Sequence, residues 1–403
     1  MDEKITLNIN NEISPSEAKD KKWLIFLICG AVGLVGGVGM ALCSILLPRE
    51  EKEALVFPNI PTMSNDAQTY SPLSGEALAD PALANAPTYC IQTPNGTDGA
   101  RPQAGLNEAG VIFEAIAEAG ITRFAAIYQN PQSAAIGPIR SLRLYYLEWD
   151  TPFDCTIVHA GGADDALAAV RAGGYKDLTE NYAYMYRGTR SARLWNNLFT
   201  TATDLRQFSA DKGYNTSNVN GFSRLTPEEA SRDRINRLVK EKLVITSPTT
   251  VNTSELVPQV SAINLRFGNV PAYNVSYAYD MTTNAYKRSY GNGKAHEIYA
   301  CPTENLGERN PEDICILTQM EPKIVVAMIV SEKKASDNYH ESITAVGTGT
   351  AYIFQNGVAI KGTWNKASRN DQIKFFDESG NEVKLAPGQT FVSAVPNYGG
   401  VEY

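Results

Sequence analysis

CTIVHAGGADDALAAVRAG, residues 155–173, combines three local signals in one short stretch. The apolar run 155–159 is typical of a buried strand, and Gly161 and Gly162 are typical of a turn. The alanine-rich run 164–172 is typical of a helix that ends at Gly173. Similar apolar runs alternate with short helical patterns from residue 87 to about 206. We therefore expect an α/β domain over residues 72–225.

The segments around this stretch complete the expected architecture. Residues 121–129 and 135–141 predict a hairpin, and 106–119 is compatible with either helix or strand. The charged segment 226–242 opens with a Thr-x-x-Glu capping box, which predicts a linker helix. Beyond it, alternating apolar runs are separated by Gly, Asn, Asp and Pro turns. This pattern predicts an antiparallel, β-rich domain over residues 243–403.

A membrane segment is expected near the start of the chain. Residues 23–47 contain no charged side chain, and as a helix they would reach about 37 Å, enough to cross an apolar core of roughly 30 Å. Three lysines precede the run, which places residues 1–22 in the cytoplasm and the remainder outside the cell membrane. Residues 48–71 have the composition of a flexible tether. A cleaved signal peptide, or a lipoprotein cleaved before Cys43, is the alternative.

Composition excludes several classes of protein. The chain has 403 residues, a net charge of −8, 43% hydrophobic residues and only three histidines. It is therefore neither disordered nor suited to a His-rich metal site, and an acidic chain has no electrostatic footprint for nucleic acid. Phosphate-binding and dinucleotide-binding glycine motifs are absent from the sequence. We expect no cofactor, no metal and no nucleic-acid partner.

The cysteines outside the expected membrane span predict disulfides, which persist outside the cytoplasm. Cys301 and Cys315 bracket a polar stretch that their pairing would fix. Cys90 and Cys155 each lie in an apolar strand-like run and would join neighbouring strands. Buried free thiols are the alternative for this second pair.

Arginine usage is the main indication of a binding site. Residues 81–206 hold nine arginines and a single lysine, and the planar guanidinium suits carboxylate or phosphate. Backbone amides at a glycine turn would add a second means of holding an anion. The predicted ligand-binding residues are Arg123, Arg140, Arg143, His159, Gly161, Gly162, Arg187 and Arg190. As alternatives, the arginines form structural bridges with nearby carboxylates such as Glu118, and His159 is a hydrogen-bonded structural residue or a general base.

Several motifs occur in an order that resembles a known family. They are ARPQAGL (100–106), GITRF (120–124), IGPIRS (136–141) and VHAGG (158–162), followed by GTW (362–364) and LAPGQT (385–390). Together they resemble the YerB-like family of bacterial envelope proteins, a two-domain family of unknown function. The resemblance implies an extracytoplasmic location and a pairing of two domains. Family members are commonly lipoproteins, and where they tend to show Pro-His-Asn this chain has Trp195-Asn196-Asn197, without the histidine.

From these observations we expect a single-pass membrane protein whose extracytoplasmic part binds its ligand without transforming it. The ligand would be an anionic envelope component that bears phosphate or carboxylate, such as a glycan or a lipid-linked precursor, or a partner protein. Two alternatives remain open at this point. One is an enzyme acting on a phosphorylated envelope lipid or glycan, and the other is a purely structural docking module.

Overall fold

The computed structural model describes residues 54–55, 68–189, 194–238, 251–252, 257–302 and 311–403. The predicted cytoplasmic tail 1–22, the predicted membrane helix 23–47 and most of the predicted tether lie outside these residues. Within the described ranges, no helix has the length and apolar character needed to cross a membrane.

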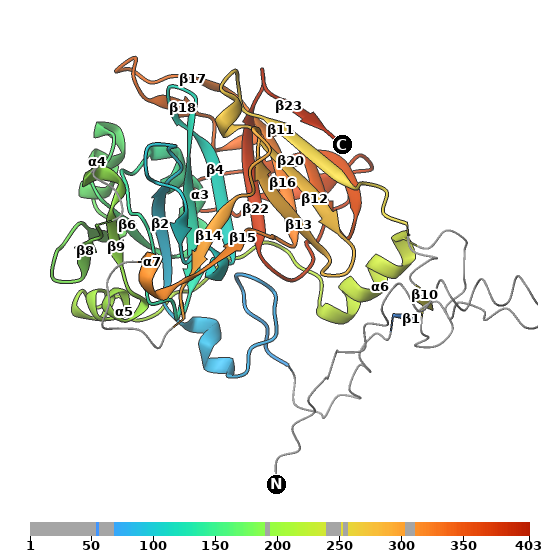
Figure 1. Cartoon of the computed structure of the whole chain (residues 1–403), viewed down its shortest axis with the longest axis horizontal. Helices are drawn as coiled ribbons and strands as arrows, with labels where there is room; N and C mark the ends of the chain where they lie inside the picture. The colour runs from blue at the N-terminus through green and yellow to red at the C-terminus, as the bar shows by residue number, and fades with distance from the viewer. Residues whose placement is uncertain (1–53, 56–67, 190–193, 239–250, 253–256, 303–310) are drawn as a thin grey trace, which may run out of the picture. The chain divides into compact units, whose positions relative to one another are not determined.

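A ten-stranded sheet forms the centre of the fold (Figure 1). Its strands, in spatial order, are β21 (Lys374–Asp377), β20 (Val358–Lys366), β19 (Gly347–Gln355), β16 (Ile324–Val330), β22 (Thr390–Pro396), β4 (Val111–Glu118), β5 (Ile121–Gln129), β2 (Thr88–Pro94), β6 (Thr156–His159) and β7 (Lys176–Thr179). β22 runs parallel to both β16 and β4. The first five strands come from the C-terminal part of the chain and the last five from the N-terminal part, so one sheet joins the two parts.

Two smaller sheets and a few short elements complete the β structure. One sheet has the order β13 (Ala285–Tyr290), β12 (Val275–Asp280), β11 (Ala262–Arg266) and β23 (Gly400–Glu402), and the other has the order β15 (Ile316–Gln319), β14 (Glu297–Ala300) and β3 (Gln103–Ala104). The remaining strands are β1 (Ala54–Leu55), β8 (Met185–Arg187), β9 (Leu198–Thr200), β10 (Val251–Asn252), β17 (Glu332–Lys334) and β18 (Glu341–Ile343). The chain is therefore β-rich in both parts, as expected for residues 243–403, but the parallel pair β16–β22 departs from the antiparallel arrangement predicted there.

The helices within the described residues are few and short. They are α3 (Leu144–Asp150), α4 (Asp164–Arg171), α5 (Ala202–Asp211), α6 (Pro227–Leu238) and α7 (Pro311–Ile314), with 3₁₀ turns at Pro81–Asn85, Leu106–Glu108, Thr151–Phe153, Leu194–Asn196 and Pro271–Tyr273. α4 connects the parallel strands β6 and β7, which confirms the strand–turn–helix prediction for 155–173. α6 opens with the predicted capping box, because Thr226 and Glu229 exchange side-chain to backbone hydrogen bonds. The α/β character expected for 72–225 is largely confined to the β6–α4–β7 unit.

The predicted hairpin between 121–129 and 135–141 is wrong. β5 instead pairs antiparallel with β4 on one side and β2 on the other. The tight turn lies at Ala119 and Gly120, both at positive φ, which is the backbone that a two-residue hairpin requires. Residues 106–119, which fitted either helix or strand, therefore supply strand β4.

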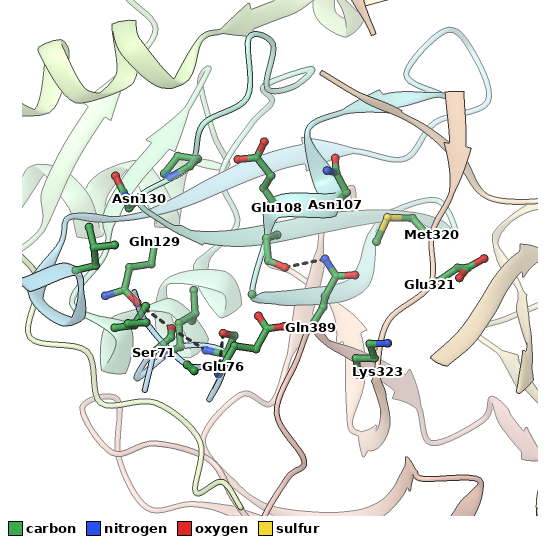
Figure 2. A pocket seen from close by; sticks show the side chains of 18 of the residues that line it. Ser71, Glu76, Asn107, Glu108, Gln129, Asn130, Met320, Glu321, Lys323 and Gln389 are labelled. Carbon is green, nitrogen blue, oxygen red and sulfur yellow. Dashed lines mark hydrogen bonds between the residues drawn. The ribbon is translucent and has the colours of Figure 1, made fainter. Parts of the chain in front are cut away.

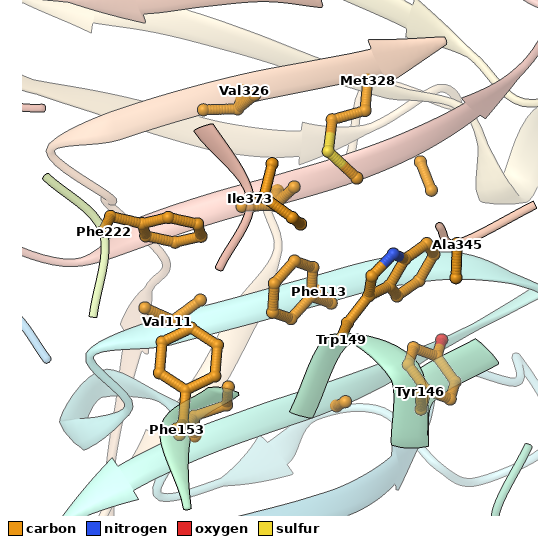
Figure 3. Close-up of a cluster of buried hydrophobic side chains, with 14 of the residues drawn as sticks. Val111, Phe113, Tyr146, Trp149, Phe153, Phe222, Val326, Met328, Ala345 and Ile373 are labelled. Atoms are coloured by element: carbon orange, nitrogen blue, oxygen red, sulfur yellow. The ribbon is translucent and has the colours of Figure 1, made fainter. Parts of the chain in front are cut away.

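The core packs against both faces of the central sheet. On one face, Phe113 of β4 stacks on Trp149 of α3 with ring centroids 5.4 Å apart, and Phe153 and Phe222 pack around them (Figure 3). The next residue, Ile112, belongs to the cluster on the other face. A strand buried on both faces has a nearly continuous apolar sequence, which explains why 106–119 gave no clear period.

Both predicted disulfides are present. Cys90 in β2 is joined to Cys155, the residue before β6, and Cys301 is joined to Cys315. The first bridge ties together neighbouring strands of the central sheet. The second closes a loop with a sequence separation of 14 residues.

Candidate anion-binding site

Two of the predicted arginines share one carboxylate at the end of the β4–β5 hairpin. Arg123 Nη2 lies 2.9 Å from Glu118 Oε1, and Arg143 Nη2 lies 2.5 Å from Glu118 Oε2. Arg123 Nη1 also donates to the Ser141 carbonyl at 2.7 Å. The tight turn places Glu118 beside β5. The segment 140–143 contacts both, since the Ser141 carbonyl accepts from Arg123 and Arg143 pairs with Glu118. The structural pairing considered for these arginines is therefore real for Arg123 and Arg143.

Arg140 differs from its two neighbours. Its backbone is fixed, because its N–H donates to the Gln92 carbonyl and its carbonyl accepts from Ala160 N–H. Its guanidinium has no hydrogen bond and no ion pair within the described residues, and Nε is buried without a partner. Asp98 and Tyr339 are the other ionisable groups that act on it at longer range, besides Glu118 and Arg143. Arg140 is therefore a partly buried cation with an unused planar donor face.

Burial is the largest influence on the pKa values of this cluster, and the neighbouring charges act beside it. Burial alone would raise the pKa of Glu118, yet Arg123 and Arg143 together lower it. Burial and the neighbouring Arg143 lower the pKa of Arg123 to about 10. Burial also lowers the pKa of Arg140, and Arg143 acts in the same direction. Three guanidinium groups with one carboxylate in contact would be stabilised by an added anion.

The glycine turn predicted to take part lies directly beside the arginines. Leu142 N–H donates to the Gly161 carbonyl at 3.0 Å, and Ala163 N–H donates to the Leu142 carbonyl at 3.1 Å. Gly161 has φ +68°, a conformation that favours glycine. The N–H groups of Gly161 and Gly162 donate to no group in the described part of the chain. Arg140 and the glycine turn are therefore neighbours along the paired backbone, and each has donors that are unused within the described residues.

The other predicted residues are engaged elsewhere. His159 is only 2% exposed, and its Nδ1 and Nε2 lie 2.7 Å from the Gly161 carbonyl and 2.9 Å from Asp177 Oδ1. Its ring therefore links the glycine turn, through the Gly161 carbonyl, to Asp177 of β7. Arg187, at the end of β8, pairs with Glu180 at 2.5 Å. Arg190 lies outside the described residues.

Sequence reasoning missed Asp98 and Tyr339. Asp98 accepts hydrogen bonds from Trp195 and Asn196, and Tyr339 is exposed in the turn between β17 and β18. An isolated bridge between Glu118 and His340 brings that turn to the site. Both residues come from distant loops with no motif, so no local pattern identifies them.

A separate pocket of about 660 Å³ lies away from the arginines (Figure 2). Its lining comes from residues 71–83, 107–110, 129–131, 318–323 and Gln389. Gln389 Nε2 donates to the carbonyls of Leu106 and Ala109, which closes one wall. No motif in the sequence predicts this pocket. In the part of the chain that the structure describes, no three His, Cys, Asp or Glu side chains are grouped to hold a metal ion.

The fold and the arginine cluster define a two-part, β-rich protein with a basic site beside a glycine turn. Two family models match it, described as "Protein of unknown function (DUF3048) N-terminal domain" over residues 73–215 and as the corresponding C-terminal domain over residues 263–392. Together they cover more than half of the chain, and the chain belongs to this YerB-like, two-domain family.

A named relative and a solved structure agree with this assignment. The chain is 24% identical over 306 residues to "Putative lipoprotein YerB" of Bacillus subtilis (strain 168), which covers 75% of this chain and 80% of the relative. The crystal structure of YerB protein from Bacillus subtilis matches with a TM-score of 0.64 and 20% identity. That match covers 83% of this chain and all of the solved one. The structural likeness shows the shared fold.

Proposed function

We propose that this protein is a membrane-tethered binding protein of the bacterial cell envelope that holds a phosphate-bearing or carboxylate-bearing component at Arg140. The envelope location is supported by the lipoprotein name of the Bacillus subtilis relative and by the apolar, uncharged run 23–47. The two disulfides fit an oxidising compartment. Anchoring by a membrane helix or by a lipid gives the same outcome, with the β-rich part outside the membrane.

The observation that carries the proposal is the unpaired guanidinium of Arg140. A buried or half-buried cation without a partner is costly, and arginine presents its donors in a fork that matches two oxygens of a phosphate or carboxylate. Arg123 and Arg143 are held in place by Glu118, so they supply positive potential without having to move. The amides of Gly161 and Gly162 would complete the contact with the anion.

The same geometry supports binding more than catalysis. Both ring nitrogens of His159 contact protein groups, so this histidine is not positioned as an open proton acceptor. The carboxylate nearest to the arginines, Glu118, is paired twice, and Arg123 and Arg143 lower its pKa against the effect of burial. A binding protein needs only the cation and the donors that the site contains.

The test uses the full chain in detergent with inorganic phosphate and diphosphate as probes. We expect both anions to raise the melting temperature, and saturation at 100-fold over Kd corresponds to about 2.7 kcal/mol. Arg140→Ala should not lower the anion-free melting temperature, because it removes a half-buried cation that has no described partner, and it should abolish the shift. Arg171→Ala removes an exposed arginine from the last turn of α4 and is the matched control. A wild-type protein that neither anion stabilises, or an Arg140→Ala protein that binds like wild type, would overturn the proposal.

A further inference from the structure

We propose a second binding site, in which the free edge of β15 and the adjoining acidic pocket take up an extended peptide segment of a partner protein that carries a basic side chain. The site lies on the β15–β14–β3 sheet and the pocket of Figure 2. It shares no residue with the arginine cluster, so it stands independently of the anion site.

The edge of β15 is open along its backbone. β15 pairs only with β14 in the described structure. Met320 N–H donates to the His296 carbonyl at 2.9 Å. Because hydrogen-bonded and non-hydrogen-bonded pairs alternate in an antiparallel ladder, the backbone N–H and C=O of Thr318 point toward β14, and those of Leu317 and Gln319 point away from it. The backbone groups of Leu317 and Gln319 meet no partner in the described ranges. Such an edge accepts an added strand.

Exposed apolar side chains accompany this open backbone. Ile316 is 71% exposed and Leu317 is 45% exposed, although both belong to a strand. Because a bare edge strand with apolar side chains favours aggregation, proteins usually protect it with charge or cover it. A partner strand laid along β15 would pair the backbone and cover both side chains.

The pocket begins where β15 ends, since Thr318 and Gln319 line it. Figure 2 shows Glu76, Glu108, Glu321 and Lys323 around the hollow; Glu321 and Lys323 come from one segment, and Glu76 and Glu108 come from two others. Three carboxylates and one ammonium group therefore line the pocket. Glu108 Oε2 already accepts from Gln132 N–H at 2.6 Å, and Lys323 Nζ already donates to the Thr283 carbonyl at 2.6 Å. The balance is negative, which favours a positively charged occupant.

The open edge of β15 and the acidic pocket together favour a peptide with a basic residue over other cationic ligands. A strand edge offers backbone donors and acceptors at the spacing of another extended chain, which a free amine or a sugar cannot match. The pocket also contains Leu78, Leu83 and Met320, which would contact the aliphatic stem of a lysine or arginine while its charged end reaches the carboxylates.

The probe is a fluorescein-labelled octapeptide of alternating threonine and valine with one central lysine, titrated against the full chain in detergent. We expect saturable binding, weakened at least 10-fold when glutamate replaces the lysine. Methylating the backbone nitrogens along one edge of the peptide should abolish binding, because these nitrogens pair with β15. Methylating the alternate nitrogens on the other edge should leave binding intact.

Variants of the protein test the two halves of the site. Leu317→Pro removes an outward N–H while keeping the β14 pairing, and Glu321→Gln removes one pocket charge; each should weaken the lysine peptide at least fivefold. Glu378→Gln, an exposed carboxylate at a distant hairpin, and Arg140→Ala should bind like wild type. Should Leu317→Pro destabilise the fold, the methylated peptides still decide the question. Failure of the lysine peptide to bind at about 1 mM, or equal tolerance of both methylation patterns, would overturn the proposal.

Discussion

Asp150 is a fully buried acid at the end of α3. Gln92 Nε2 donates to its Oδ2 at 3.2 Å, while its Oδ1 and Gln92 Oε1 have no partner in the described structure. Burial raises the pKa of Asp150 well above its usual value. Burial therefore favours the protonated carboxyl group, whose proton would supply the donor that an acid–amide pair requires.

This protonation makes stability depend on pH. The unfolded chain releases the Asp150 proton near its ordinary pKa of about 3.9, while burial keeps the proton on the folded chain to higher pH. The contribution of this group to the free energy of unfolding is fully present below that pH. It declines as the pH rises toward the pKa of the folded state, by up to about 1.4 kcal/mol per pH unit. Asp150→Asn keeps the shape and provides the missing donor.

We therefore expect Asp150→Asn to unfold at higher urea concentration than wild type, with a difference that grows between pH 5 and pH 7.5. Urea denaturation at pH 5 and at pH 7.5 measures this difference in the unfolding midpoint. Asp165→Asn on the exposed start of α4 is the matched control and should show no such growth. An Asp150→Asn protein that is less stable than wild type at pH 7.5 would show that the buried group is charged.

At the scale of single elements, the two disulfides make different contributions. In the chain-entropy account, a bridge stabilises by restricting the unfolded chain, and the effect grows with loop length. The Cys90–Cys155 loop spans 65 residues and the Cys301–Cys315 loop spans 14. We expect replacing the first pair by alanine to cost about 4 kcal/mol and the second about 3 kcal/mol. Equilibrium unfolding of the two double variants checks the order, which a larger loss for Cys301→Ala/Cys315→Ala would contradict.

Elements with local determinants could be predicted from the sequence. The glycine turn after β6, the helix α4 and the capping box of α6 depend on neighbouring residues, and all three are present. The partners of β5 and the parallel direction of β22 depend on which distant strands meet, and an apolar sequence does not encode that. Arg123 and Arg143 meet at Glu118, although the hairpin expected to bring Arg123 beside Arg140 does not form. The pocket beside β15 combines five separate segments and left no sequence signal.

At the scale of the whole molecule, the two family-defined parts are joined by backbone pairing and by a buried ion pair. β22 pairs with β4, and Arg288 of β13 lies 2.8 Å from Glu114 of β4, with both side chains completely buried. Arg288 also donates to Tyr277 and to His296 Nδ1. The domain boundaries predicted at residues 225 and 243 stay predictions, although the shared sheet indicates that the parts are stable only together.

We expect thermal unfolding to be a single transition for this reason. Arg288→Met should leave Glu114 as an unpaired buried charge, which costs about 3–5 kcal/mol, and should lower the one transition without dividing it. Calorimetry of the wild-type and Arg288→Met proteins measures both effects, with Arg171→Met as the control on an exposed helix. Two resolved transitions in the wild type would show that the halves unfold separately.

The central claim, that Arg140 is the residue that receives the anion, is tested most directly by NMR of the arginine side chains. The full chain labelled with ¹⁵N at arginine Nε is titrated with inorganic phosphate, and Arg140→Lys assigns the resonance. We predict that the Arg140 Nε–H signal moves to a saturating end point with the same Kd as the thermal shift, while that of Arg171 stays in place. A stationary Arg140 signal under saturating phosphate would contradict the account.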